Sequence, residues 1–470
     1  MTRKQKRKQK QKRKQTATSA PTAHAPLFNW PVIQPSQDSH ALALQYQFDR
    51  SQWWQEKDLL AHQLRRIQNV IDHAAATVPF YRDRLAAAAR LKAGALTLEA
   101  FRAIPFLTRA DIQDAGAALA SRTPPKGHGA VFPVRSSGST GRPVKVQGTG
   151  LTSLLSNAFT MRGHIWHKRN FDAKNVDIRT AFPAGQEPAH AKWAPVVATG
   201  PSIRFDIARP ISELCDDLVQ ADPAYLQTHP NTLAGLIERS IEIGAAPESL
   251  REVRTFGETL EPAIRAMARE HWNVPVVDSY SAMELGIIAH QCPETTSLHI
   301  QSEGVLVEVL DGDRVCRPGE VGRVVLTALH NFATPLIRYD IGDYAKVGAA
   351  CSCGRGLPVL DRVVGRERTL LVYPNGDRQF PEARYGIERI APIRQFQLTQ
   401  KTVERIEVKL AVSRPLRGDE EAEVRAVLTD RLRYAFDYEF VYVDEITRAA
   451  NGKFFEFQSE VSTLPTRADN

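Results

Sequence analysis

Apolar stretches with helical spacing alternate with short strand-like runs through the middle of this chain, and no other feature of the sequence constrains the fold as strongly. Strands and helices that alternate in this way are typical of an α/β domain, in which the helices cover a mostly parallel sheet. Apolar spacing from Trp53 onward predicts a helix that ends near Pro79, and a second helix is predicted to start after Thr108. Further helices are predicted at 151–166, 231–243 and 261–271, and strands at 131–134, 195–198, 225–228 and 274–280. We therefore expect a large α/β domain.

The pattern changes after about residue 298, where strand-like segments follow one another without helices between them. Three such segments lie at 298–310, 322–329 and 338–347, separated by turns that contain Gly and Asp. They predict a β-rich subdomain over about 298–360, within an N-terminal domain of residues 31–365.

A second, smaller unit is expected at 366–470. Its first part contains Asn375-Gly376 between apolar residues, which predicts a hairpin. The remainder predicts a strand at 405–412, a charged helix at 419–433 and a strand at 440–446. These elements predict a compact α+β domain of about 100 residues.

The net charge of +8 comes from the first residues rather than from the body of the chain. Positions 1–16 hold nine Lys or Arg and no acid, which leaves 52 basic and 53 acidic residues in the rest. Such a segment cannot bury apolar surface, so residues 1–30 are predicted to be a disordered basic tail and linker. The tail is either a solvated segment with weak affinity for polyanions or a contact to nucleic acid or an anionic membrane.

The apolar runs and the cysteine content indicate in which compartment the protein resides. No run of 18 apolar residues occurs, and the tail lacks the apolar core of a secretory signal. Five cysteines in 470 residues argue against a disulfide scaffold. We therefore expect a cytoplasmic protein, monomeric or homodimeric, in a reducing compartment.

A loop rich in Gly and hydroxyl side chains follows the strand at 131–134. Its residues are Ser136, Ser137, Gly138, Ser139, Thr140 and Gly141, followed by Arg142, Pro143 and Lys145. Glycines leave backbone N–H groups accessible to a ligand, and the hydroxyls and cations add donors and positive charge. The loop does not match G-x-x-x-x-G-K-[ST]. On its own it is equally a polar linker or a cradle for a polyphosphate.

Three further segments carry chemistry that suits a nucleotide. Glu284 follows the strand ending near Asp278 and could hold Mg²⁺. Asp343 lies beside a glycine, where a carboxylate can accept hydrogen bonds from ribose hydroxyls. Lys453 lies in an Asn-Gly-Lys turn near the C-terminus. Taken singly, each signal is weak: a residue like Glu284 is more often a solvated helix cap, one like Asp343 a turn residue, and one like Lys453 a surface lysine.

Together, these segments resemble the adenylate-forming superfamily, and most closely its phenylacetate–CoA ligase-like branch. The resemblance covers roughly residues 55–460 and rests on SSGSTGRPVK, FGETLEP, YSAMELG, GEVGRVVLTAL, TPLIRYDIGD, GLPVLDRVVGR and the terminal NGK. It implies a large N-terminal adenylating domain of several subdomains and a small, mobile C-terminal domain.

The resemblance also implies roles for single residues. Ser136 to Lys145 would wrap the outer phosphates of ATP, and Glu284 would bind Mg²⁺. Asp343 and Arg366 would bind the ribose hydroxyls. Residues that would flank the adenine and acyl sites are Gly257, Glu258, Tyr280 and Ser281. Lys453 would bridge the carboxylate and the α-phosphate during adenylation.

The implied reaction joins a carboxylic acid to ATP, releases pyrophosphate and passes the acyl group to an acceptor. CoA is the expected acceptor, and an amine or a carrier protein is the alternative, because Arg368 replaces the acidic residue that is usual at the family's hinge. A non-catalytic polyanion-binding protein is an alternative of another class. Candidates for an aromatic acyl pocket are Phe182, Phe205, Tyr225, His229, Phe256 and Tyr280.

Four of the five cysteines lie after residue 290, and the fifth is Cys215. Cys292, His299, Cys351 and Cys353 supply three thiols and one imidazole, the ligand set of a tetrahedral structural Zn²⁺ site. The alternative is that these cysteines are small buried apolar residues. His290 could replace His299 as the nitrogen ligand.

Overall fold

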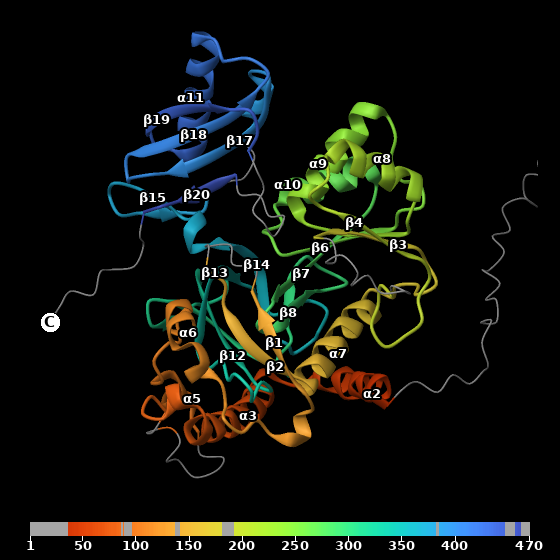
Figure 1. Ribbon diagram of the computed structural model, residues 1–470, viewed down its shortest axis with the longest axis vertical. Coiled ribbons are helices and arrows are strands. Elements are labelled where there is room, and N and C mark those ends of the chain that lie inside the picture. The colour runs from red at the N-terminus through yellow and green to blue at the C-terminus, as the bar shows by residue number, and fades with distance from the viewer. Residues whose placement is uncertain are drawn as a thin grey trace, which may run out of the picture.

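The computed structural model describes residues 36–85, 88, 96–136, 142–180, 192–381, 385–446 and 456–461 (Figure 1). Two bodies are visible, a large one at the bottom and right of Figure 1 and a smaller one at the top left, drawn in blue. The large body holds most of the chain, and the smaller one holds the last helix and its sheet. Among the described residues, no helix is both long enough and apolar enough to cross a membrane.

The α-helices lie where apolar spacing and caps place them. Their bounds are α2 Ser36–Ser51, α3 Glu56–Thr77, α5 Leu98–Arg102, α6 Arg109–Ala115, α7 Gly150–Trp166, α8 Ile211–Ala221, α9 Pro230–Ile243, α10 Pro262–Met267 and α11 Gly418–Leu432. Short 3-10 helices occupy Pro79–Tyr81, Gly116–Leu119, Lys126–His128, Glu367–Thr369 and Ile387–Arg389, and a π-helical turn occupies Ala268–Trp272.

Helix α6 illustrates how the sequence sets a boundary. The Thr108 side chain accepts a hydrogen bond from the Asp111 backbone, and the Asp111 side chain accepts one from the Thr108 backbone. This reciprocal capping box satisfies donors that the first helical turn leaves unpaired. Helix α3 ends at Thr77 because Pro79 follows and restricts the residue before it. Both helices are confirmed as predicted.

The strands form one large sheet and three small ones. In chain order they are β1 Val131–Arg135, β2 Lys145–Thr149, β3 Asn175–Arg179, β4 Ser202–Asp206, β5 Tyr225–Thr228, β6 Glu252–Phe256, β7 Val276–Ala282, β8 Gly286–Gln291, β9 Leu298–Ile300, β10 Val305–Asp311, β11 Arg314–Val315, β12 Val321–Ala328, β13 Tyr339–Val347, β14 Val359–Arg366, β15 Leu371–Val372, β16 Arg378–Gln379, β17 Ile393–Gln400, β18 Arg405–Val412, β19 Asp437–Val443 and β20 Phe457–Ser459.

The large sheet has twelve strands in the order β11-β10-β12-β13-β14-β9-β8-β7-β6-β5-β3-β4. Strands β4, β3, β5, β6 and β7 run parallel, with helices α8, α9 and α10 packed against them (Figure 1). From β7 to β11 each neighbouring pair is antiparallel. The β-rich segment after residue 298 therefore continues the α/β sheet, and β9 joins the two parts.

Two expectations about strands differ from the structure. The apolar run at 195–198 is not a strand: Val197 N–H donates to Pro195 O at 2.8 Å, and Val196 has a φ of 61°. Val196 of this run packs beside Trp193 in the core. The strand that extends the sheet past β3 comes later in the sequence and is β4. Strand β17 was not predicted, because polar residues fill the alternate positions of IRQFQLTQ and conceal its apolar face.

The smaller body is built on a four-stranded sheet in the order β19-β18-β17-β20. Strands β17 and β18 are antiparallel, whereas β19 and β20 add in parallel at the two edges. Helix α11 packs on this sheet through Val424, Leu428 and Leu432. The predicted hairpin is confirmed, since β15 and β16 pair across Gly376, whose φ is 87°.

Candidate active site

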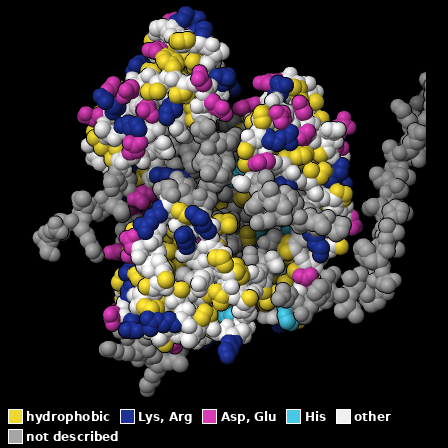
Figure 2. Space-filling model, in the orientation of Figure 1, with side chains coloured by type: hydrophobic (Ala, Val, Ile, Leu, Met, Phe, Trp, Pro, Cys, Tyr) yellow, Lys and Arg dark blue, Asp and Glu magenta, His cyan; other side chains and the backbone are white. Residues whose placement is uncertain are grey.

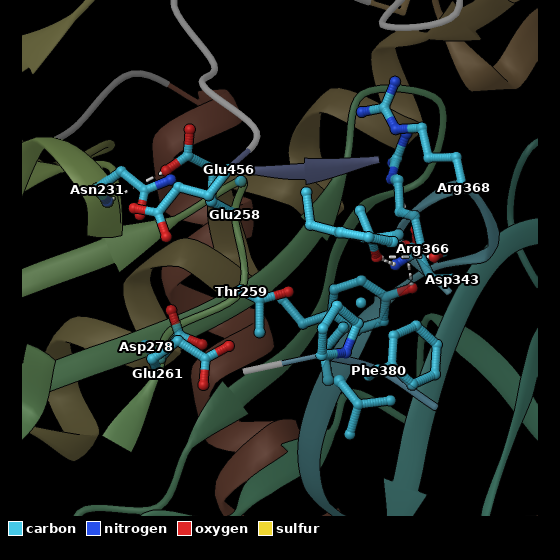
Figure 3. Close-up of a pocket in the computed structure, with 18 of the residues that line it drawn as sticks. Asn231, Glu258, Thr259, Glu261, Asp278, Asp343, Arg366, Arg368, Phe380 and Glu456 are labelled. Carbon is cyan, nitrogen blue, oxygen red and sulfur yellow. Dashed lines mark hydrogen bonds and ion pairs between the residues drawn. The ribbon is translucent and has the colours of Figure 1, made fainter. Parts of the chain in front are cut away.

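A pocket lies where the carboxyl ends of β6 and β7 meet the β13–β14 hairpin and the start of β20 (Figure 3). Ligands of open α/β sheets commonly bind outside the carboxyl ends of the strands. Its polar lining comes from Asn231, Glu258, Thr259, Glu261, Asp278, Ser279, Tyr280, Ser281, Asp343, Arg366, Arg368, Thr369 and Glu456. Figure 3 shows Arg366 and Arg368 on one side and Glu258, Glu261, Asp278 and Glu456 on the other.

Tyr280, Asp343 and Arg366 form the most closely connected group in this pocket. The Tyr280 hydroxyl donates to Asp343 Oδ2 at 2.7 Å, and Arg366 Nε lies 2.9 Å from Asp343 Oδ1. Strands β13 and β14 bring the latter two together, since Asp343 pairs with Arg366 in the ladder. The structure thus joins three residues that the sequence predicted separately.

Burial and charge together fix the protonation of this group. Burial, and then the Asp343 carboxylate, raise the pKa of Tyr280 well above its ordinary value, so its hydroxyl remains a donor. The Asp343 carboxylate raises the pKa of Arg366. Burial, followed by the Arg366 guanidinium, lowers the pKa of Arg368 to about 10, which leaves Arg368 charged at neutral pH.

Gly365 shapes the wall beside this group. Its φ of 152° is one that residues with a side chain rarely adopt. A Cβ at this position would meet Phe380 Cδ1 and Thr369 Oγ1, each at 2.8 Å. Glycine therefore lets Phe380 close against the hairpin, where it also contacts the Tyr344 ring at 5.4 Å between centroids.

Glu258 lies on the opposite side, and its carboxylate is turned toward the start of α9. Its Oε2 accepts from the Asn231 backbone at 3.2 Å, and its Oε1 lies 3.4 Å from His229 Nδ1. A carboxylate at a helix N-terminus is stabilised by the helix dipole. Gly257 precedes it with a φ of 79°. Glu258 therefore lines the pocket and also orients α9.

Glu284 lies outside this lining, in the turn between β7 and β8. The Tyr339 hydroxyl donates to Glu284 Oε1 at 3.2 Å, and burial raises the pKa of Tyr339. Glu284 lines a second cavity, whose walls come from β1, β2, α7 and the residues around Asn331. Glu284 lies four positions after Tyr280, which lines the first pocket.

The ends of the Ser/Gly loop are joined at its base. Ser136 N–H donates to Val144 O at 2.9 Å, and Val144 N–H donates to Ser136 Oγ at 2.8 Å. Lys145 begins β2 and is exposed. The predicted site residues Ser137, Gly138, Ser139, Thr140, Gly141 and Lys453 lie outside the described residues. Glu456 and Phe457 follow Lys453 in the sequence and line the first pocket.

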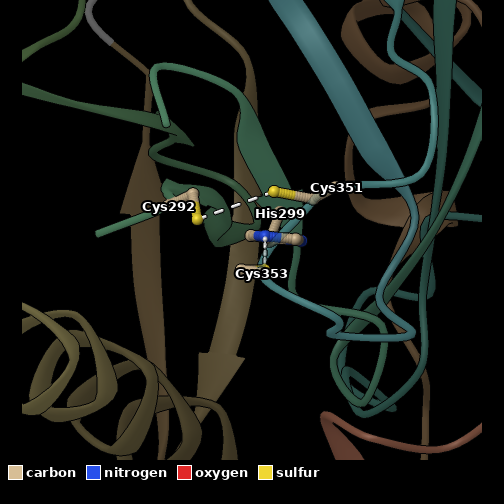
Figure 4. A group of neighbouring side chains, drawn as sticks. All are labelled: Cys292, His299, Cys351 and Cys353. Carbon is tan, nitrogen blue, oxygen red and sulfur yellow. Dashed lines mark hydrogen bonds between the residues drawn. The ribbon is translucent and has the colours of Figure 1, made fainter. Parts of the chain in front are cut away.

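The structure brings the predicted cysteine and histidine ligands together (Figure 4). The four candidate ligand atoms of Cys292, His299, Cys351 and Cys353 all lie within 4.8 Å of one another. Cys292 Sγ and Cys351 Sγ are 3.7 Å apart, and Cys353 Sγ is 3.3 Å from His299 Nε2. His290 instead contacts Phe159 O at 2.8 Å, so His299 is the member of this cluster.

The aromatic residues considered for an acyl pocket separate into two groups. Tyr280 lines the first pocket, and Phe256 lies beside it, in contact with the His229 ring at 4.8 Å between centroids. Tyr225 packs against Trp193 in the core, and Phe205 packs at the edge of the apolar cluster around α8 and α9. Phe182 lies outside the described residues.

Several pocket residues were not predicted from the sequence. Phe380 comes from the segment after β16, and Glu456 directly precedes β20. Both belong to the C-terminal part of the chain, so only the packing of that part against the hairpin brings them to the pocket. Thr259, Glu261 and Asp278 lie within or close to quoted motifs, where closer attention to strand ends could have identified them.

Comparisons with known proteins relate this geometry to a family. The chain is 27% identical over 381 residues to a phenylacetate–coenzyme A ligase of Thermus thermophilus, covering 76% of this chain and 82% of the relative. It is 25% identical over 366 residues to the phenylacetate–coenzyme A ligase of Escherichia coli, covering 73% and 80%. The predicted resemblance is confirmed. Over about three quarters of its length the chain is similar in sequence to phenylacetate–coenzyme A ligases.

The fold agrees with this similarity. A structure of 2-hydroxyisobutyryl-CoA ligase in the postadenylation state matches with a TM-score of 0.68 at 17% identity, covering 88% of this chain and 92% of that one. The family described as the CapK C-terminal domain matches residues 386–457. This range contains β17, β18, α11 and β19, and it ends at Phe457, the first residue of β20. The predicted α/β fold with a small C-terminal unit is therefore confirmed.

Proposed function

We propose that this protein is an AMP-forming acid–thiol ligase that uses ATP to activate a carboxylic acid and then transfers the acyl group to CoA. The observation that carries the proposal is the Tyr280–Asp343–Arg366 group in a pocket formed by the large sheet and β20. The similarity to phenylacetate–coenzyme A ligases over three quarters of the chain supports it.

The nucleotide would bind with its ribose beside Asp343. A carboxylate is an acceptor with about four lone-pair directions, and Tyr280 and Arg366 occupy one direction on each oxygen. The remaining directions suit the two ribose hydroxyls. Glu284 would hold Mg²⁺ through a carboxylate oxygen, with Tyr339 orienting it. The loop from Ser136 to Lys145 would bind the outer phosphates.

In the first step a carboxylate oxygen attacks the α-phosphorus, the bond to the β-phosphate oxygen breaks, and pyrophosphate leaves. Two anions must approach each other, so cations that neutralise them stabilise the transition state. Lys453 would supply one such charge. Its place in the sequence supports this role, because Glu456 and Phe457, a few residues later, line the pocket.

In the second step the CoA sulfur attacks the acyl carbon, the acyl–phosphate C–O bond breaks and AMP leaves. The small domain would turn about a hinge near Arg366 to Arg368 between the two steps, with the division between the domains at residues 365 and 366. Tyr280 and Phe256 favour an aromatic acid. Transfer to an amine or a carrier protein stays a prediction. Contact of the basic tail with a polyanion also stays a prediction.

The test of adenylation is carboxylate-dependent exchange of labelled pyrophosphate into ATP across a panel of aromatic and aliphatic acids. We expect exchange with at least one acid and a loss of about 10²–10³-fold in Lys453→Ala, as for a group that stabilises transition-state charge. Lys409→Ala, on β18 of the same domain, is the matched control. Absence of exchange across the whole panel would sink the proposal.

We also propose that Cys292, His299, Cys351 and Cys353 hold a structural Zn²⁺. With Zn–S bonds of about 2.3 Å in a tetrahedral site, two sulfurs lie about 3.8 Å apart, close to the observed 3.7 Å. His299 Nδ1 lies 3.4 Å from Leu357 O, so its Nε2 is left for the metal. A cytoplasmic location would keep the thiols reduced.

This site would tie the β13–β14 connection, which carries Cys351 and Cys353, to the β8–β9 region. The hairpin that carries Asp343 and Arg366 would then be held at both ends. Metal analysis of purified protein should give about one Zn²⁺ per chain, lost in the Cys351→Ser/Cys353→Ser double variant and kept in Cys316→Ala. A metal-free wild-type protein of full stability would exclude the site.

A further inference from the structure

Three aromatic side chains are exposed at the junction of α2 and α3. Tyr46 is 68% exposed, Trp53 51% and Trp54 41%, and no other tryptophan among the described residues is exposed to this degree. Large aromatic side chains are usually buried over most of their surface. Apolar residues that are exposed as a group, rather than singly, mark a surface that binds a partner. We call Tyr46, Trp53 and Trp54 the aromatic corner.

The aromatic corner is held in place from behind by Gln52, which is buried. The Gln52 backbone oxygen accepts a hydrogen bond from Gly356 N–H at 2.8 Å. Its side-chain Oε1 accepts from Trp166 Nε1 at 3.0 Å and from Arg355 Nε at 2.9 Å. The Arg355 guanidinium also lies over the Trp53 ring, 5.2 Å from its centroid. The exposure of the corner is therefore a property of a backbone that the core fixes.

The chemistry of the corner suits the boundary between a membrane and water. Tryptophan and tyrosine combine a large apolar ring with a polar tip, and for that reason they gather at membrane–water interfaces. Arg50 Nη1 donates to the Tyr46 hydroxyl at 3.0 Å, so a cation that can pair with a lipid phosphate lies beside the exposed ring. The corner itself carries charges of both signs, from Asp49, Arg50, Glu56, Lys57, Asp58 and Arg355.

The charge that selects an anionic surface comes from the basic segment, residues 1–16, which holds nine Lys or Arg and no acid. The rest of the chain holds 52 basic and 53 acidic residues. Figure 2 shows Lys and Arg interspersed with Asp and Glu over the small body and over α8 and α9. Anionic lipids attract a polybasic segment only within about a Debye length, roughly 8 Å, of the surface. The basic segment must therefore reach the surface that the corner contacts.

The length of the intervening chain allows this. Residues 17–35 join the basic segment to α2, and at about 3.3 Å per residue this stretch can span roughly 60 Å. Helix α2 has 16 residues and is therefore about 24 Å long, with the corner beyond its C-terminal end. Figure 1 shows α2 and α3 at the end of the large body that is remote from the small body. A surface that docks there would leave the small body room to move.

We propose that the aromatic corner and the basic segment dock this protein on a membrane surface that contains anionic phospholipids. Stable attachment of a protein without a spanning helix takes two signals. Here the corner supplies rings that enter the interfacial layer, and the basic segment supplies the charge that selects anionic headgroups. The proposal concerns where the protein resides, so it holds or fails independently of the proposed ligase reaction.

The first experiment measures co-sedimentation of the full-length protein with vesicles of phosphatidylcholine, with and without phosphatidylglycerol. We expect binding to the mixed vesicles that weakens as salt is added. Deletion of residues 2–16 and the Trp53→Ala/Trp54→Ala double substitution should each weaken it about tenfold or more, because each removes one of the two signals. Ile241→Ala, at an exposed apolar residue of α9, is the matched control and should bind as the wild type does.

The second experiment needs no variant that weakens the fold. Lipids with brominated acyl chains quench the fluorescence of tryptophans that enter the membrane. In a Trp30→Phe background, which removes the tryptophan that precedes α2, mixed vesicles should quench the fluorescence. The quenching should disappear when Trp53→Phe and Trp54→Phe are added, because both keep an aromatic ring at the corner.

Three results would overturn the proposal. The first is equal binding to neutral and mixed vesicles, or mixed vesicles that bind without quenching. The second is binding of RNA that requires residues 2–16 but not the corner, together with no vesicle binding, which would assign the basic segment to nucleic acid. The third is self-association without vesicles that Trp53→Ala/Trp54→Ala abolishes, which would make the corner a contact between two copies of the chain.

Discussion

At the scale of single residues, the Asp343 carboxylate organises the pocket, because it holds both the Tyr280 hydroxyl and the Arg366 guanidinium. Asp343→Asn keeps the shape and removes the charge. A hydrogen bond to a charged group contributes about 1.5–3 kcal/mol, so we expect KM for ATP to rise about 10- to 100-fold. Pyrophosphate exchange at varied ATP concentrations measures this change.

The matched control for this substitution lies on the same hairpin. Asp361 is partly exposed on β14 and pairs with Lys346 at 3.1 Å, away from the pocket. Asp361→Asn should leave KM for ATP within about twofold, as expected for an exposed ion pair. Equal effects of the two substitutions would mean that Asp343 acts through the stability of the hairpin rather than through the nucleotide.

Single residues also explain why sequence motifs predicted only part of the site. Asp343 and Arg366 were predicted because each lies in a short characteristic segment, and the ladder then placed them side by side. Phe380 and Glu456 carry no local signal, since their role depends on how the C-terminal part packs. Sequence reasoning therefore identified the hairpin side of the pocket and missed the side that closes it.

At the scale of elements, the β13–β14 hairpin depends on one glycine. Gly365→Ala would force a side chain onto a φ of 152° and into contact with Phe380. Backbone strain of this kind costs about 1–3 kcal/mol, so we expect lower thermal stability together with weaker ATP binding. Differential scanning fluorimetry with and without ATP measures both effects.

Gly418→Ala provides the comparison for that variant. Gly418 begins α11, and a Cβ there would meet no atom within 4 Å. Alanine should be neutral or slightly stabilising, because it favours the helix. If Gly365→Ala behaved in the same way, the close contact with Phe380 would not constrain the hairpin.

Elements also differ in how well their patterns predicted them. Helix α6 was predicted because both members of its capping box are local. The run at 195–198 has the composition of a strand. In the structure it forms a turn instead, because Val196 packs into the buried cluster around Trp193. Strand β17 gains its stability from pairing with β18 and β20, which the sequence of β17 alone does not indicate.

At the scale of the whole molecule, buried histidines make stability depend on pH. Burial lowers the pKa of His330 to about 4, whereas an unfolded histidine titrates near 6.5. Between these values the unfolded chain binds a proton that the folded protein does not. The free energy of unfolding should therefore fall as the pH drops from about 6.5 toward 4, by up to about 1.4 kcal/mol per pH unit.

Urea unfolding at pH 7.5 and 5.0 measures this dependence. His330→Asn should reduce the difference between the two pH values, since the variant removes one proton-binding group from the unfolded chain. His40→Asn, which changes an exposed histidine on α2, should leave the difference unchanged. An unaltered difference in His330→Asn would assign the acid sensitivity to other groups.

The position of β9 has a consequence for the growing polypeptide. This three-residue strand pairs with β8 on one side and with β14 on the other, and β14 ends at Arg366. A chain still under synthesis exposes an unpaired strand edge, which attracts other strands, until residue 366 has emerged from the ribosome. Fragments that stop between β9 and β14 should therefore aggregate, and the shortest well-behaved piece of the large body should end after Arg366.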